Sequence, residues 1–375
     1  MKTGFRLEKA KSLMEEQGID CIISNSMANV YYTSGSPIST ITNLKRLAAI
    51  FLPIDDDPVF AVHANEEVTA RNSTWIKDLR VYEGGEWESL KAIDFVAEVI
   101  KEKGLDDKKI GIELIELPGL WLDHLRVLLP KTEFVDSKHI LDKMRSIKSA
   151  EELKLLSDAN MATAKAITVA FETARPGDTE RDIALDMIRL ALKYGGDTVA
   201  FMTLGAGKNI LETHHIPKDY KIKKGDLIHV DFGCYFDRYY SDISRMAVVG
   251  EPNQTQIKAY DIAVEAERVT SNAMHAGTKV IDVHNAVKKF YESKGHEYTR
   301  AFIGHSMGIG CHELPFLGPS DGEWILEPGM FFQVEPGMRI GNERVHTEDS
   351  FVVKTQGPAK NVSEYRDVTE LQVIK

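Results

Sequence analysis

The stretch VDFGCYFDRYYSD, residues 230–242, places two aspartates in what we predict to be a β-hairpin. Asp231 follows the apolar residues 227–230, and Asp242 lies near the start of the next predicted strand. If the turn falls at residues 236–237, the two aspartates are equally far from it and face each other across the hairpin, with Cβ atoms about 5 Å apart. The stretch therefore predicts two carboxylates side by side on one face of a sheet.

A second pair of acidic residues has the same symmetry further along the chain. Glu335 and Glu348 are equidistant from Gly341 and Asn342, and Gly-Asn is a favourable two-residue hairpin loop. Glu335 also ends the apolar run MFFQV, residues 330–334, where a buried carboxylate is costly unless it is paired or hydrogen-bonded. This second hairpin is thus expected to present two more carboxylates.

One histidine joins these acids as a candidate ligand. His305 follows Gly304 and precedes the glycine-containing residues 306–310, and glycine lets the backbone come close to a ligand. Like charges held close together repel unless one is protonated or cations lie between them. The predicted set suits a pair of divalent cations and consists of Asp231, Asp242, His305, Glu335 and Glu348.

Composition limits the classes of function. The chain has 375 residues, of which 43% are hydrophobic and 27% charged, which is enough for two globular domains. Its net charge is −11 and its lysines and arginines are scattered, unlike the basic surface of a nucleic-acid-binding protein. The 3 cysteines have no paired spacing, and neither a secretion signal nor a membrane-spanning run is recognisable. We therefore predict a cytoplasmic protein without nucleic-acid or membrane partners.

Hydrophobic periodicity divides the chain into two parts. Helix-like and strand-like segments alternate in the first part, which predicts an α/β domain over residues 1–142 with a structural, substrate-covering or oligomerisation role. The second part, residues 143–375, begins with a long helix for which Ser149 and Glu152 form a capping box. The expected helices are residues 6–17, 90–103, 120–129, 150–172, 180–194, 254–276 and 280–293, and the expected strands are 19–24, 47–53, 58–62, 109–114, 132–135, 198–204 and 227–232.

Several motifs in the second part occur together in one known family. They are VDFG at 230–233, YYSDISR at 239–245, GHSMGIGCHELP at 304–315, VEPG at 334–337 and TED at 347–349. This part resembles the pita-bread metallopeptidases, which include methionine aminopeptidase, aminopeptidase P and prolidase, and is most similar to the branch of Xaa-Pro dipeptidase and aminopeptidase P. The first part resembles the creatinase-type N-terminal domain, through NVYYTSG at 29–35.

The resemblance implies an α/β N-terminal domain followed by an α+β pita-bread catalytic domain, and it assigns roles to the candidate ligands. Asp231 would be a terminal ligand of one metal ion, Asp242 and Glu348 would bridge two ions, and His305 and Glu335 would complete the second site. Mn or Co would be the favoured ions, with Zn or Fe as alternatives. Glu335 would also act as general base.

Two further histidines match family residues that contact the substrate. They are His312 and His214, although His214 and its neighbour His215 could equally be surface polar residues. Two positions depart from the family pattern: His346 stands where the prolidase branch commonly has arginine, and Ala301 stands where many relatives have histidine. Because arginine binds a carboxylate through two parallel hydrogen bonds and histidine does not, recognition of a dipeptide C-terminus is left open.

The function implied is hydrolysis of the Xaa-Pro bond of dipeptides or short peptides by a hydroxide that bridges two metal ions. The alternative is a metal-dependent pita-bread enzyme that acts on a small non-peptide nitrogen compound or osmolyte. A non-catalytic binding protein is a third possibility, which the intact ligand set disfavours. The resemblance also implies a homodimer. Peptide length, the native metal and the subunit number are not determined by the sequence.

Overall fold

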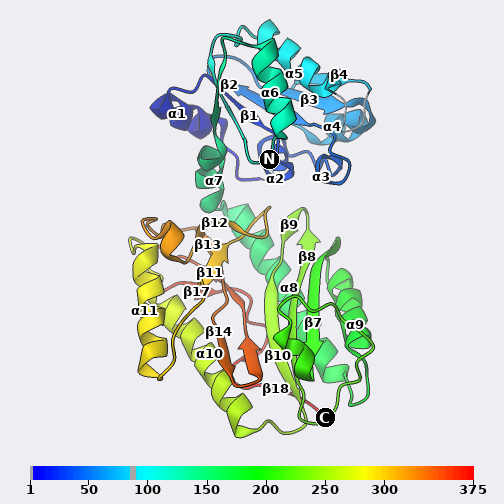
Figure 1. Cartoon of the computed structure of the whole chain (residues 1–375), viewed down its shortest axis with the longest axis vertical. Coiled ribbons are helices and arrows are strands. Elements are labelled where there is room, and N and C mark those ends of the chain that lie inside the picture. Colours follow the sequence, from blue (N-terminus) through cyan, green and yellow to red (C-terminus); the bar gives the residue numbers. More distant parts are fainter. Residues whose placement is uncertain (1–2, 85–89) are drawn as a thin grey trace. The chain divides into compact units, whose positions relative to one another are not determined.

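The computed structural model describes residues 3–84 and 90–375, and its chain divides into two compact units, Met1–Arg145 and Ser146–Lys375 (Figure 1). Met1 and Lys2 lie outside the described residues; they belong to the N-terminal segment in which no secretion signal is recognised. No helix in the described ranges combines the length and the apolar character needed to cross a membrane. The expected α/β part followed by a part of mixed helices and strands is confirmed, and each unit is described separately.

The N-terminal unit is built on one mixed sheet in the order β4-β3-β2-β1-β5-β6. Its core lies where α5 and α6 pack on strands β1, β2, β3 and β5, and consists mainly of valine, isoleucine, leucine and alanine. The strands are β1 (Cys21–Ser24), β2 (Ala49–Pro53), β3 (Val59–His63), β4 (Asp78–Tyr82), β5 (Lys109–Ile112) and β6 (Glu133–Asp136). The helices are α1 (Leu7–Gln17), α2 (Met27–Ser34), α3 (Thr40–Asn43), α4 (Glu67–Ser73), α5 (Lys91–Glu102), α6 (Gly119–Leu128) and α7 (Lys138–Ser146).

The C-terminal unit contains two larger sheets, in the orders β18-β10-β8-β7 and β12-β11-β13-β16-β17, and the separate hairpin β14-β15. Helices α8 and α9 cover the first sheet, whereas α10 and α11 pack with the second (Figure 1). The helices are α8 (Ala150–Thr173), α9 (Glu180–Lys193), α10 (Gln254–Ala273) and α11 (Val280–Ser293). The strands are β7 (Thr198–Ala206), β8 (Leu227–Phe236), β9 (Tyr239–Tyr240), β10 (Ile243–Val249), β11 (Gly304–Ser306), β12 (Glu313–Phe316), β13 (Phe331–Val334), β14 (Gly337–Ile340), β15 (Glu343–His346), β16 (Asp349–Val352), β17 (Lys360–Asn361) and β18 (Gln372–Ile374).

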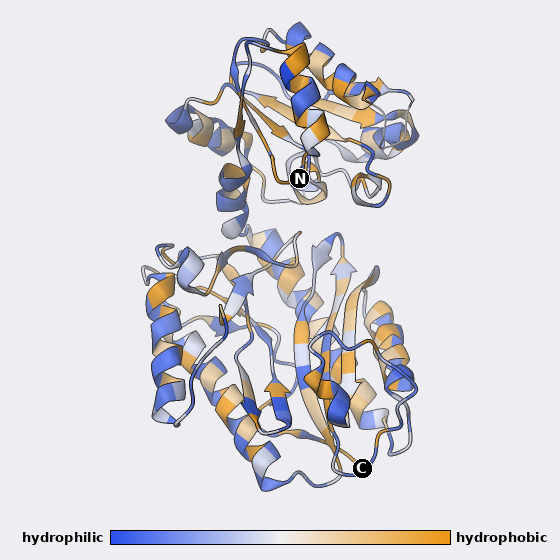
Figure 2. Cartoon of the chain, in the orientation of Figure 1, coloured by the Kyte–Doolittle hydropathy of each residue, from blue (hydrophilic) through white to orange (hydrophobic). Residues whose placement is uncertain are grey.

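Local sequence signals account for the helices of this unit. Ser149 caps α8 and forms the predicted capping box with Glu152, and Thr179 does the same for α9 with Asp182. Figure 2 shows helices that are apolar on one side and polar on the other, beside strands that are mostly apolar, as expected for elements covering a shared core. The structure also contains α7 and β18, which the periodicity did not predict.

The register predicted for the first hairpin is wrong. Asp231 pairs with Ser244, not with Asp242, because the turn falls one residue later, at Asp237 and Arg238. Both turn residues have positive φ, 49° and 70°, which is what a tight two-residue loop of this kind requires. Asp242 then lies between β9 and β10, outside the regular ladder. Asp242 is two positions before Ser244, with only Ile243 between them, so it stays on the same side of the sheet as Asp231.

The register predicted for the second hairpin is confirmed. Ile340 pairs with Glu343 across the turn at Gly341 and Asn342, and Gly341 has φ 62°. The same register continues beyond this hairpin, where Val334 pairs with Asp349 in the β13–β16 ladder. Glu335 and Glu348 are therefore next to each other at the junction of the two ladders, as the symmetry of the sequence predicted.

Candidate metal centre

The two sheets of the C-terminal unit meet along one row of residues. Asp231 on β8 lies opposite Ser244 on β10, and Ser244 in turn forms a β-bridge with Glu348. The Glu348 N–H donates to the Ser244 carbonyl at 3.1 Å. Because this row joins the first sheet to the second, carboxylates that are far apart in the sequence are held near one another.

His305 on β11 completes the cluster. Its Nε2 lies 3.8 Å from Asp242 Oδ2, 3.8 Å from Glu335 Oε1 and 3.7 Å from Glu348 Oε1. Ligand atoms of Asp242, His305 and Glu348 all lie within 4.8 Å of one another, and all three residues are buried. The Asp231 and Asp242 carboxyl groups are close enough to hydrogen-bond when one is protonated. The structure therefore brings the predicted residues together.

Burial and mutual repulsion oppose ionisation of these carboxyl groups. Burial, then the charges of Asp231 and Glu335, raise the pKa of Asp242 well above its usual value. Burial and the neighbouring Asp242 have the same effect on the pKa of Glu348. Burial lowers the pKa of His305 to about 4, so the imidazole is neutral at physiological pH. Without counter-ions the cluster cannot be fully ionised, whereas bound cations would favour its ionised form.

Orphaned oxygen atoms give an independent test of whether cations fit. Asp231 Oδ1, Asp242 Oδ1 and Glu348 Oε1 are buried and have no hydrogen-bond partner among the described residues. Such atoms are rare in folded proteins unless something else satisfies them. A carboxylate-rich set with one neutral imidazole suits divalent cations that accept oxygen and nitrogen donors, and the residues present therefore fit metal ions.

The pKa of Glu335 shifts in the opposite direction from those of Asp242 and Glu348, because its carboxylate contacts His346 and Arg300. His346 Nε2 lies 3.0 Å from Glu335 Oε2, and Arg300 donates to the same oxygen and to the Glu335 carbonyl. Burial opposes ionisation of Glu335, but the hydrogen bond with His346 and the charge of Arg300 outweigh it and hold the pKa below its usual value. Glu335 is thus ionised throughout the neutral pH range.

Arg300 was not predicted from the sequence. It lies in a segment without regular structure before β11, where no periodicity marks a functional residue. His346 was noted only as a departure from the family pattern. In the structure both side chains contact Glu335 Oε2. One sequence signal could have indicated Arg300: it is next to Ala301, which stands where many relatives have histidine.

The two predicted substrate histidines differ in how they lie. His312 is exposed, and its ring stacks near that of His305, with centroids 4.0 Å apart. It also belongs to a second group of potential ligands with Asp242 and Cys311, whose Sγ is 3.4 Å from Asp242 Oδ2. His214 is exposed and makes no hydrogen bond or ion pair with the residues that the structure describes.

His215, the neighbour of His214, has a structural position. It is buried, with Nε2 3.0 Å from Glu180 and Nδ1 2.7 Å from Glu212. Glu180 also accepts hydrogen bonds from the backbone N–H groups of Ala206 and Lys218. Of the adjacent pair, only His214 is therefore available to a substrate.

Comparisons with known proteins identify relatives of both units. The family model for metallopeptidase family M24 matches residues 154–355, and that for the creatinase/prolidase N-terminal domain matches residues 6–147. The chain is 26% identical over 369 residues to the Xaa-Pro dipeptidase of Pyrococcus furiosus, which covers 97% of this chain and 99% of that protein. It is 28% identical over 361 residues to the Xaa-Pro dipeptidase of Lactobacillus helveticus, with 94% and 95% covered.

Solved structures show the same fold over the full length. A dipeptidase from Pyrococcus horikoshii superposes with a TM-score of 0.86 at 29% identity, over 98% of this chain and 100% of that one. An X-Pro aminopeptidase from Thermotoga maritima gives a TM-score of 0.85 at 22% identity, over 98% and 99%. The second comparison establishes likeness of fold alone.

Proposed function

Because the chain belongs to metallopeptidase family M24, we propose that it hydrolyses the Xaa-Pro bond of dipeptides or short peptides. The expected architecture, a creatinase-type N-terminal domain before a pita-bread catalytic domain, is confirmed. The chain is thus a metallopeptidase. The preference for a proline after the scissile bond is inferred from relatives named Xaa-Pro dipeptidase, to which the chain is 26% and 28% identical.

One observation carries this proposal: Asp242, His305 and Glu348 offer ligand atoms within 4.8 Å of one another, with Glu335 and Asp231 beside them. We assign five residues that would hold two divalent ions: Asp231 would be a ligand of one ion, His305 and Glu335 of the other, and Asp242 and Glu348 of both. When bound, the ions would lower the pKa of a water molecule and polarise the scissile carbonyl. Mn and Co are the favoured ions, with Zn or Fe as alternatives.

The protein's own side chains would then move the proton and orient the substrate. Glu335 is ionised, as a general base must be, and it would take a proton from the attacking water and deliver it towards the leaving nitrogen. His346 and Arg300 hold this carboxylate in one orientation. His312 is exposed beside His305 and would donate to the substrate carbonyl as negative charge develops, and we assign His214 to a similar contact.

Reconstitution with defined metals tests the proposal. The full-length protein would be treated with chelator, loaded separately with Mn²⁺, Co²⁺, Zn²⁺ or Fe²⁺, and assayed on Ala-Pro, Ala-Pro-Ala and Ala-Ala. We expect Mn²⁺ or Co²⁺ to restore cleavage of a proline-containing peptide, with Ala-Ala much slower. The ratio of the rates on Ala-Pro and Ala-Pro-Ala separates a dipeptidase from an aminopeptidase.

The same experiment can reject the peptidase assignment. If the loaded protein retains its ions yet cleaves none of these peptides, a small non-peptide nitrogen compound becomes the better substrate class. The expected homodimer remains a prediction, which sedimentation velocity on the loaded protein would test.

A further inference from the structure

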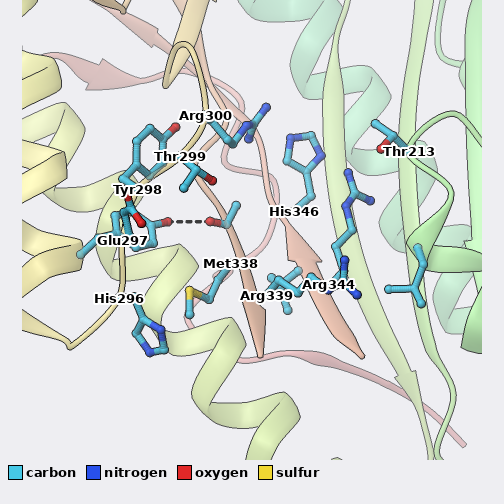
Figure 3. A pocket seen from close by; sticks show the side chains of 14 residues that line it. Thr213, His296, Glu297, Tyr298, Thr299, Arg300, Met338, Arg339, Arg344 and His346 are labelled. Carbon is cyan, nitrogen blue, oxygen red and sulfur yellow. Dashed lines mark hydrogen bonds between the residues drawn. The ribbon is translucent and has the colours of Figure 1, made fainter. Parts of the chain in front are cut away.

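A pocket of about 480 Å³ opens in the C-terminal unit between the β14–β15 hairpin and the segment 296–300 that precedes β11 (Figure 3). His346, which contacts Glu335, is one of its lining residues. The pocket therefore adjoins the candidate metal centre. Its size is within the range of pockets that hold small ligands.

Three arginines line this pocket. Arg339 and Arg344 are directly opposite each other in the β14–β15 ladder, and Arg300 reaches the same space from the preceding segment (Figure 3). Like charges placed directly across two strands destabilise the pair unless an opposite charge lies between them. Among the lining residues Glu297 is the only acid, and it is exposed.

The guanidinium groups of Arg339 and Arg344 are held by backbone carbonyl groups. Arg339 Nε donates to the Gly341 carbonyl at 2.9 Å, and Arg344 Nη1 donates to the Ile210 carbonyl at 3.2 Å. Neither guanidinium forms an ion pair with any carboxylate of residues 3–84 or 90–375. Arg300 differs, because Glu335 already neutralises it.

The environment of Arg344 makes the absence of an anion costly. Its side chain is partly buried, and burial and then the charge of Arg300 lower its pKa, while the nearby charges of Asp231 and Glu335 oppose this shift. Guanidinium groups pair with carboxylates through two parallel hydrogen bonds, which would relieve this repulsion. Leu211, which is exposed, adds apolar surface to the same pocket, suited to the methylene groups of a side chain.

We propose that this pocket binds the acidic side chain of a peptide substrate, with its carboxylate between Arg344 and Arg339. The inference rests on the proposed peptidase function and specifies its substrate class, namely peptides with a glutamate or aspartate beside the scissile bond. Lys in place of either arginine would keep the charge and lose the paired hydrogen bonds.

Matched dipeptides of equal size test the proposal. Glu-Pro and Gln-Pro differ only in the charge of one side chain, so the ratio of their kcat/KM values measures recognition of that charge. We expect the Mn²⁺-loaded protein to favour Glu-Pro, and Arg344→Gln to lower the Glu-Pro to Gln-Pro ratio by roughly tenfold to hundredfold. Arg344→Lys should lower it less. Arg268→Gln, an exposed change on α10 with the same loss of net charge, is the control and should leave the ratio unchanged.

Further measurements identify which carboxylate is bound and keep the two proposals separable. Gln-Pro and Gln-Pro amide differ only at the C-terminus, and if Arg344→Gln alters only their ratio, the pocket binds the C-terminal carboxylate and the proposal is overturned. Glutarate binding, followed by calorimetry, should weaken by a similar factor in Arg344→Gln. Binding that depends on Arg344 without cleavage of any proline peptide would reject the peptidase function and retain an acid-binding pocket. Equal cleavage of Glu-Pro and Gln-Pro by the unaltered protein would retain the peptidase function and reject the acid-binding pocket.

Discussion

His346 Nε2 lies 3.0 Å from Glu335 Oε2 and joins the end of β15 to the residue that follows β13. The other ring nitrogen of His346 is 3.2 Å from Ser244 Oγ, so the imidazole is fixed from both sides. Ser244 belongs to the row that links Asp231 with Glu348. A residue that departs from the family pattern is therefore integrated into the scaffold of the proposed metal centre.

Replacement of His346 should raise the pKa of Glu335. In metal-free His346→Ala the hydrogen bond to Glu335 is lost while burial still opposes ionisation, so the pKa of Glu335 should rise. Loss of a hydrogen bond to a charged group corresponds to a rise of roughly one to two pH units. NMR titration of the carboxyl groups in the metal-free protein and in the variant measures the shift. An unchanged titration of Glu335 would show that His346 does not set its pKa.

Removal of a bridging carboxylate should have opposite effects on metal binding and on metal-free stability. Asp242→Ala should abolish tight binding of both ions and hydrolysis, because Asp242 is shared between them. The metal-free variant should nevertheless be more stable at neutral pH than the metal-free unaltered protein, because burial and repulsion raise the pKa of Asp242 well above its usual value. Elemental analysis and denaturant unfolding in chelator measure these two effects.

The corresponding control is Asp186→Ala, an exposed change on α9 that removes one acid far from the cluster in the fold. It should leave metal content and unfolding nearly unchanged. Glu348→Ala should behave like Asp242→Ala, since the pKa of Glu348 is raised for the same reasons. Two tightly bound ions in either cluster variant would refute the bridging assignment.

His312 should affect turnover without affecting metal content. Its exposed ring stacks beside His305 and is not among the assigned ligands. Loss of one donor to developing negative charge costs about 2 to 4 kcal/mol in a dry site, so His312→Ala should reduce kcat by roughly thirtyfold to a thousandfold. His275→Ala is the control, because His275 is exposed and its side chain is hydrogen-bonded to the Asn272 carbonyl. A variant that loses metal together with activity would instead make His312 a ligand, possible through the group it forms with Asp242 and Cys311.

The features predicted correctly from the sequence are those set by neighbouring residues. The bounds of α11, Val280–Ser293, coincide with the predicted helix, and the capping box of Ser149 and Glu152 forms as expected. The turn at Gly341 and Asn342 is set by backbone chemistry that glycine favours, and it fixes the register that brings Glu335 and Glu348 together. Such signals involve residues that are close together in the sequence, so they can be recognised without knowing the fold.

The features that were missed depend on contacts between distant segments. The Asp237 and Arg238 turn has positive φ at two residues that rarely adopt it, and this displaced the first hairpin from its expected register. Strand β18 forms by pairing with β10, more than a hundred residues earlier, and its own sequence is too short to show a period. Arg300 lies near Glu335 only after folding.

Glu267 on α10 gives a test of pH-dependent stability at a carboxyl group that is not an assigned ligand, although it contacts the residues on either side of Glu348. It is buried beside Asp349, which pairs with Arg245 at 2.6 Å, and Thr347 donates to it at 3.3 Å. Burial, and then the charge of Asp349, raise the pKa of Glu267 well above its usual value. The folded protein therefore keeps this carboxyl protonated at pH values where the unfolded chain has released the proton.

The sign of the pH effect follows from this difference. A raised pKa in the folded state gives stability that is fully present below the unfolded pKa near 4.5 and is lost as pH rises through the folded pKa. Glu267→Gln carries no proton to lose and keeps a donor that can face Asp349. The free energy of unfolding of the unaltered protein should therefore fall relative to that of the variant, by up to about 1.4 kcal/mol per pH unit, as pH rises from 5 towards the folded pKa. Urea unfolding of both proteins at pH 5, 6, 7 and 8 measures the difference. If the difference in free energy of unfolding between the two proteins stays constant over this range, Glu267 is ionised in the folded protein. Arg245 would then neutralise both Glu267 and Asp349.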